Sequence, residues 1–125
     1  MAEQRAHPRY AIELDCVLEP DGGGAHLHGR TQDISRGGFC MLGAAATPVI
    51  PAATPCNVKL ALVFSETEFS EHLTLRGSIA WCTKLKSGVQ IGVKFDALDA
   101  QSRGYLDLFI KFLEDGREPD DGADE

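Results

Sequence analysis

Two arginines, Arg5 and Arg9, stand four residues apart in the stretch EQRAHPRY (3–10), at the start of an otherwise acidic chain. Arginine carries a planar fork of N–H donors, which binds a phosphate or the O6/N7 edge of guanine through paired hydrogen bonds. Pro8 stiffens the segment and biases His7 toward an extended conformation. Two guanidinium groups on such a segment can turn toward one anion, although arginines at this spacing are also common on ordinary surfaces.

A second polar cluster lies in QDISRGGF (32–39). Strand alternation predicts that Asp33 and Ser35 share one face while Ile34 points into the core. An ionised carboxylate accepts two hydrogen bonds and therefore matches the adjacent N1–H and N2–H donors of guanine, whereas a serine hydroxyl suits a phosphate, ribose or backbone group. The two glycines that follow permit a tight turn and close approach of a ligand. The alternative is a strand-end turn in which both side chains satisfy their own backbone.

Other residue patterns do not indicate catalysis or a metal site. The four cysteines lie far apart without a CxxC pair, and they are expected to be buried free thiols. HLH (26–28) could place two imidazoles on one strand face, but a third ligand is missing nearby. Ser35 with His7 or His28 lacks the third group of a nucleophilic triad. We therefore expect neither an enzyme nor a metalloprotein.

Length and charge narrow the class further. A chain of 125 residues suits one domain, and its net charge of -7 is concentrated in residues 114–125, which hold seven acids and one base. That segment is expected to be a disordered tail that aids solubility or binds a partner. A pI near 5.0 argues against binding of nucleic acid polymers. No apolar run reaches the ~20 residues of a membrane span, and no signal peptide is evident, so we expect a cytoplasmic protein without membrane insertion.

Period-two alternation dominates the first two-thirds of the chain. It predicts strands at 12–19, 25–35, 39–42, 57–64, 73–85 and 89–95, with a glycine-rich turn at 20–24. In the strand at 73–85, Ile79 and Trp81 are expected on the same inward face. Helical spacing then predicts an amphipathic helix over 96–115, with Asp99 as its N-cap. Several short one-sided strands followed by one helix indicate an antiparallel barrel or sandwich with a C-terminal helix.

The order of these motifs resembles the PilZ family, the receptor domain for cyclic di-GMP. The resemblance joins RxxxR (5–9), DxSxxG (33–38) and GSIAWCTKLKSGVQIGVKF (77–95), and it covers roughly residues 4–112. It implies a mainly β fold, a six-stranded antiparallel β-barrel of the split-barrel type with a C-terminal α-helix. It also implies a ligand site, in which the matching residues are Arg5, Arg9, Asp33, Ser35 and Gly38, with Arg36 at a variable position as an extra phosphate contact.

Together with the charge distribution, the resemblance leads us to expect three parts along the chain. Residues 1–9 would form a flexible ligand-binding arm, residues 10–113 the barrel with its helix, and residues 114–125 the acidic tail. The chain would be a stand-alone receptor or adaptor that needs no cofactor besides the ligand cyclic di-GMP and signals to an unidentified protein target by ordering the arm. The alternative is a protein-interaction module of motility or pilus machinery that does not depend on the nucleotide. The sequence leaves the downstream process, such as motility or biofilm formation, open.

Overall fold

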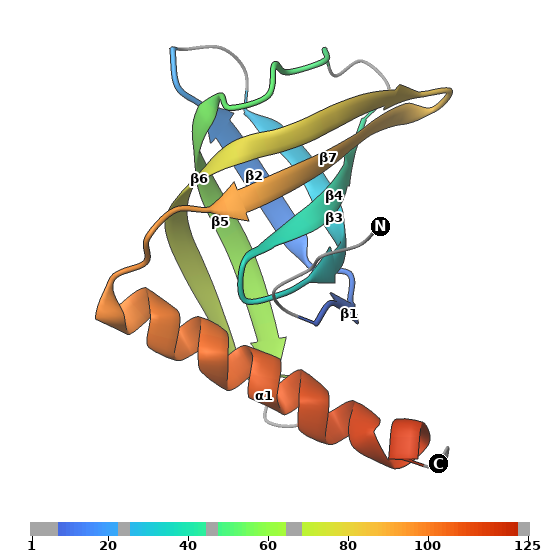
Figure 1. Cartoon of the computed structure of the whole chain (residues 1–125), viewed down its shortest axis with the longest axis vertical. Helices are drawn as coiled ribbons and strands as arrows, with labels where there is room; N and C mark the ends of the chain where they lie inside the picture. Colours follow the sequence, from blue (N-terminus) through green and yellow to red (C-terminus); the bar gives the residue numbers. More distant parts are fainter. Residues whose placement is uncertain (1–7, 23–25, 45–47, 65–68, 123–125) are drawn as a thin grey trace.

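The computed structural model describes residues 8–22, 26–44, 48–64 and 69–122, which form one antiparallel β-structure with a C-terminal helix (Figure 1). Arg5 and His7 lie outside the described residues, as does most of the expected arm over residues 1–9. The elements are, in chain order, β1 (Tyr10–Ala11), β2 (Asp15–Pro20), β3 (Leu27–Ile34), β4 (Gly38–Gly43), β5 (Pro55–Phe64), β6 (Phe69–Leu85), β7 (Gly88–Phe95) and α1 (Ala100–Gly122).

Six of the strands close into a barrel. The pairing order is β3-β2-β5-β6-β7-β4, and β4 pairs back onto β3, so the sheet has no open edge between its first and last strands. All pairings are antiparallel, and β1 forms a two-residue ribbon with the C-terminal end of β3. The six-stranded barrel implied by the resemblance is confirmed, and the sandwich alternative is excluded because one continuous sheet closes on itself.

The barrel interior is filled by alternate residues of each strand. In β7, for example, Ile91, Val93 and Phe95 are buried while Lys94 is exposed, which is the pattern expected of a sheet with one face on the core. Phe39 of β4 packs against Phe95 with ring centroids 5.8 Å apart. This alternation was readable in the sequence and it places the outward-facing residues of β4, β6 and β7 on one continuous surface.

Helix α1 crosses one end of the barrel and contacts β5 and β6 (Figure 1). Asp99 caps it as predicted, because its Oδ1 accepts the backbone N–H of Ser102 at 2.7 Å. The helix buries one apolar face, made by Leu106, Phe109, Ile110 and Leu113. No helix in the described part of the chain combines the length and apolar character that a membrane span requires.

The helix boundaries differ from the prediction of 96–115. Helix α1 begins at Ala100 and continues to Gly122. It therefore includes residues 114–122, which we expected in a disordered tail. Two contacts support the helix at this boundary. Glu114 bonds to the barrel, as described below, and Lys111 faces Asp115 one turn on at 3.9 Å. Residues 123–125 lie outside the described part.

All four cysteines are free, and three of them are buried as expected. Burial raises the pKa of Cys16 to about 12 and that of Cys56 to about 11, and burial also raises the pKa of Cys40. Such thiols are protonated at neutral pH and are poor nucleophiles or metal ligands. Cys82 departs from the prediction because it is only half-buried, with its sulfur near the backbone N–H of Ile50 at 3.4 Å.

Candidate functional site

Arg9 and Asp33 from the two predicted motifs form a direct ion pair. The Nε and NH2 atoms of Arg9 lie 3.1 and 2.9 Å from the same carboxylate oxygen, Oδ1 of Asp33. Both side chains are mostly buried, with exposed fractions of 24% for Arg9 and 31% for Asp33. The pairing of β1 with β3 sets Ala11 opposite Asp33, which brings the end of the first motif beside the second. The structure thus joins two residues that stand 24 positions apart.

A β-bulge determines which way Asp33 faces. The register of β3 against β4 shifts between Thr31 and Asp33, so one extra residue, Gln32, is inserted there. Thr31 and Ile34 both stay buried, while Gln32 is exposed and Asp33 half-exposed on the outer surface. The bulge therefore turns Asp33 outward, toward Arg9.

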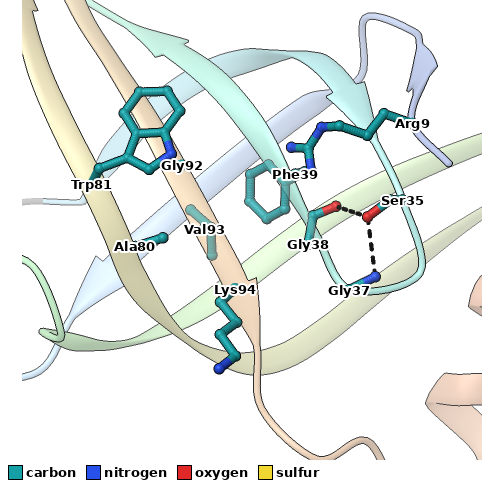
Figure 2. Close-up of a pocket in the computed structure, with 10 residues that line it drawn as sticks. All are labelled: Arg9, Ser35, Gly37, Gly38, Phe39, Ala80, Trp81, Gly92, Val93 and Lys94. Carbon is teal, nitrogen blue, oxygen red and sulfur yellow. Dashed lines mark hydrogen bonds between the residues drawn. The ribbon is translucent and has the colours of Figure 1, made fainter. Parts of the chain in front are cut away.

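Ser35 is buried within the turn that follows β3 and does not share the outer surface with Asp33. Its Oγ accepts the backbone N–H of Gly37 at 3.1 Å and donates to the carbonyl of Gly38 at 3.3 Å (Figure 2). Its own N–H bonds to the same carbonyl at 2.8 Å. Ser35 therefore adopts the alternative predicted from the sequence, a strand-end turn in which its side chain bonds to nearby backbone. The hydroxyl thereby stabilises the loop. Its predicted contact with a ligand stays a prediction.

Gly38 occupies a position that no larger residue can take. A β-carbon there would collide with the backbone carbonyl of Val93, because β4 begins where it crosses close to β7. The glycine of DxSxxG therefore permits the close approach of two strands and lets the turn close against β7. The N–H of Phe95 fastens the same turn by bonding to the carbonyl of Gly37 at 2.9 Å.

Arg36 faces the helix in this structure. Its Nε lies 3.3 Å from Oδ1 of Asp107, and its NH1 lies 3.6 Å from Oε2 of Glu114, both on α1. An extra phosphate contact, as predicted for Arg36, would require its guanidinium to leave these carboxylates. That role stays a prediction.

Trp81 faces outward, which corrects the sequence interpretation. A second bulge, at Ala80, shifts the register of β6 against β7, so Trp81 does not share the inward face of Ile79. Its indole lies over Gly92 of β7, where a β-carbon would collide with the ring, and 43% of its surface is exposed. The simple alternation failed here because an inserted residue reverses the face of everything beyond it.

Arg9, Ser35, Gly38 and Trp81 line one cavity of about 400 Å³, and Asp33 reaches it only through its ion pair with Arg9. Figure 2 shows Arg9 and Trp81 on opposite sides of it, with the turn at Ser35 and Gly38 beside Arg9 and with Lys94 along a third side. Lys94 was missed by the motif analysis, although its position between two buried residues of β7 marks it as outward-facing. Among the described residues it has no carboxylate partner, so the cavity has a lysine beside it whose charge is not neutralised by an ion pair.

The sequence profile of the PilZ domain matches residues 3–112. The chain belongs to the PilZ domain family. The match spans RxxxR, DxSxxG, the barrel and α1 as far as residue 112, and it agrees with the closed barrel found here. A search of curated proteins found no match to this PilZ chain.

Solved PilZ structures share the fold at low sequence identity. The PilZ domain of YcgR from Escherichia coli, in a structure with c-di-GMP, aligns with a TM-score of 0.72 at 12% identity, covering 95% of this chain and 98% of that one. The motility inhibitor MotI/DgrA of Bacillus subtilis aligns with a TM-score of 0.70 at 14% identity and 88% coverage of this chain. The K. pneumonia MrkH–c-di-GMP complex aligns with a TM-score of 0.64 at 22% identity, covering 94% of this chain. This PilZ chain spans about half the length of MotI/DgrA and MrkH, at 51% and 55%.

Proposed function

We propose that this PilZ chain is a receptor for cyclic di-GMP, and that the cavity between Arg9 and Trp81 holds the nucleotide. The proposal depends above all on the ion pair of Arg9 with Asp33 beside this cavity. Cyclic di-GMP carries two phosphate charges and two guanines, so its binding needs a guanidinium, a carboxylate and an aromatic surface in one place. Structures of YcgR and MrkH with c-di-GMP add the support of relatives that have the same fold.

In this proposal, the two carboxylate oxygens of Asp33 bind different partners. Arg9 contacts Oδ1 through two nitrogens, and Oδ2 has no hydrogen bond or ion pair with a described residue. Oδ2 then accepts the N1–H or N2–H of a guanine, while the outer N–H groups of Arg9 bind the O6/N7 edge or a phosphate. Arg5 supplies the second fork of RxxxR. The contact with Asp33 restricts the rotamers of Arg9, which reduces the side-chain entropy lost when a ligand binds it.

Trp81 offers a stacking surface for a base on the opposite side of the cavity. Its indole is held against Gly92, and stacking of a base on an aromatic ring is worth about 1–3 kcal/mol. Lys94 offers a positive charge to a phosphate at the third side. Ser35 and Gly38 maintain the turn and line the same cavity, so a ligand there reaches the backbone of the turn.

The function is binding and signalling, not catalysis. Ligand phosphates draw Arg5 and Arg9 together, order the arm over residues 1–9 and change the adjacent surface for a protein target. We place this in the cytoplasm, where four free thiols are kept reduced. The downstream process is one that a second messenger controls, such as motility or biofilm formation.

Calorimetric titration with cyclic di-GMP, with GTP as the control, tests the proposal. We expect saturable binding of cyclic di-GMP and far weaker binding of GTP, because one GTP cannot supply two guanines and two phosphates in the cyclic arrangement. Absence of heat with cyclic di-GMP, in a sample that melts cooperatively, would refute the receptor and favour the nucleotide-independent interaction module. Partner capture with and without the nucleotide then separates a switch from a constitutive module.

A further inference from the structure

Acidic side chains on one face of helix α1 contact Tyr10, which directly follows RxxxR, and Arg36, which lies within DxSxxG. Oε2 of Glu114 accepts the hydroxyl of Tyr10 at 2.7 Å, and the same oxygen lies 3.6 Å from NH1 of Arg36. Asp107, seven residues earlier on the helix, lies 3.3 Å from Nε of Arg36. Residues seven apart in a helix face the same side. One helix face thus joins the segment that follows Arg9 and the turn at Arg36, two segments that lie on the same side of the cavity.

The contact with Tyr10 acts on the segment that carries Arg9. Tyr10 follows Arg9 directly, and β1 pairs with β3 over two residues, opposite Ile34 and Asp33. So short a ribbon fixes its first residues weakly through backbone bonds alone. Arg9 turns to Asp33 while its neighbour Tyr10 turns to the helix, so the two side chains fasten the segment from opposite sides.

The contact with Arg36 acts on the turn that carries Ser35 and Gly37. Arg36 stands between these two cavity-lining residues, and its side chain is about 30% exposed. Two carboxylates of α1 restrain its guanidinium, and the backbone bond from Phe95 to Gly37 restrains the turn from the barrel side. The turn is therefore held between β7 and α1.

We propose that Glu114 is a positioning residue of the ligand site, which holds Tyr10 and Arg36 at once and so fixes the geometry between Arg9 and the turn. This proposal rests on the proposed function for its ligand. It gives Arg36 a supporting role and makes α1 part of the site without contact to the ligand. Because coupling between two events is reciprocal, ligand bound in the cavity against Arg9 and the turn also stabilises the docked helix.

The charges around Glu114 agree with this role. The hydrogen bond from Tyr10, followed by the charge of Arg36, holds the pKa of Glu114 below its ordinary value, so the group is ionised at neutral pH. The charged groups that face it are Arg36 and, along the helix, Lys111, while Asp107 shares Arg36. Glu114 therefore meets the barrel as an anion facing two donors, Tyr10 and Arg36.

Glu114→Ala and Asp115→Ala form a matched pair for the test. Each removes one negative charge from the same helix turn, but Asp115 is exposed and faces Lys111 instead of the barrel. Charge alone predicts that either change tightens the binding of a dianionic ligand slightly. Positioning predicts that Glu114→Ala weakens the affinity for cyclic di-GMP by roughly fivefold or more, whereas Asp115→Ala does not. Tyr10→Phe, which alters no charge, should weaken it in the same direction.

Amide exchange in the ligand-free protein tests the positioning without the nucleotide. In Glu114→Ala, the N–H groups of Ile12, Ser35 and Phe95, which bond across the ribbon and the turn, should exchange faster than in Asp115→Ala. Unchanged exchange at these amides, or affinity equal to that of Asp115→Ala, would overturn the inference. If the wild-type protein bound no cyclic di-GMP, the proposed function would fail, while the exchange measurement would still decide whether Glu114 positions the two segments.

Discussion

Trp81 and Gly92 are directly opposed on neighbouring strands, and the indole occupies the space that a side chain at residue 92 would fill. The tryptophan and the glycine of the GSIAWCTKLKSGVQIGVKF pattern therefore act together. The glycine lets the ring lie close against the sheet, and the ring leaves 43% of its surface exposed beside Arg9's cavity. A flat, supported aromatic face is suited to stack with a nucleobase.

Trp81 is the single tryptophan of the chain, so its fluorescence reports on the cavity alone. We expect cyclic di-GMP to quench this fluorescence in a saturable manner, because a stacked guanine replaces water at the exposed ring face. The midpoint should coincide with the calorimetric dissociation constant. GTP at the same concentrations serves as the control for absorption by guanine, and calorimetric binding without any change in emission would remove Trp81 from the site.

Gly92→Ala should weaken the binding of cyclic di-GMP because its β-carbon displaces the indole of Trp81. Losing a stacking contact worth about 1–3 kcal/mol corresponds to a loss of affinity of roughly 5- to 150-fold. Gly104→Ala is the matched control, since its β-carbon would meet open space on α1. That control should bind normally and melt slightly higher, because alanine favours the helix. Equal affinities of the two variants would contradict the role of the Trp81–Gly92 pair.

Arg9→Ala should lower the affinity for cyclic di-GMP roughly 10- to 100-fold, the loss expected when a charge-assisted hydrogen bond is removed. Its partner Asp33 is partly exposed, so the freed carboxylate can be hydrated and the fold should persist. Arg30→Ala controls for charge, because Arg30 is exposed, pairs with Glu13 and Asp15, and does not line this cavity. Titration calorimetry on both variants makes the comparison. If both variants lost affinity equally, the effect of Arg9→Ala would come from long-range electrostatics and not from direct contact with the ligand.

Much of the fold was predictable because it depends on local patterns. Alternation predicted the strands, Asp99 predicted the helix start, and the motif order implied the six-stranded barrel. The outward position of Trp81 was not predictable from alternation, since the bulge at Ala80 is evident only from the register in which β6 pairs with β7. The continuation of α1 beyond residue 115 was missed because acidic composition was taken to indicate disorder.

The site was predictable in its residue types but only partly in its geometry. RxxxR and DxSxxG identified Arg9 and Asp33, yet their ion pair depends on the register of β1 against β3. The bond of Tyr10 to Glu114 spans 104 positions, and the sequence holds no local signal for it. Such contacts arise from how the helix crosses the barrel end, which is a property of the assembled fold.

The stabilisation that Glu114 provides should depend on pH. Its pKa is lowered in the folded protein, first by the hydrogen bond from Tyr10 and then by Arg36. The stabilisation is therefore fully present above the ordinary value of 4.5 and is lost as pH falls through the lowered folded value. Thermal midpoints of the wild type and of Glu114→Ala, measured from pH 7 to pH 3, should differ at neutral pH and converge in acid. A difference that stays constant across this range would contradict the ionised contact.

Docking of α1 should depend on its buried face, and two leucines of the helix test this. Leu106 is fully buried, whereas Leu108, two residues on, is 55% exposed. Leu106→Ala should lower the free energy of unfolding by about 2–5 kcal/mol, because it removes apolar contacts and leaves a cavity against the barrel end. Leu108→Ala should change it by about 0.5 kcal/mol or less. Urea unfolding followed by circular dichroism measures both, and comparable losses would mean that α1 does not pack on the barrel through this face.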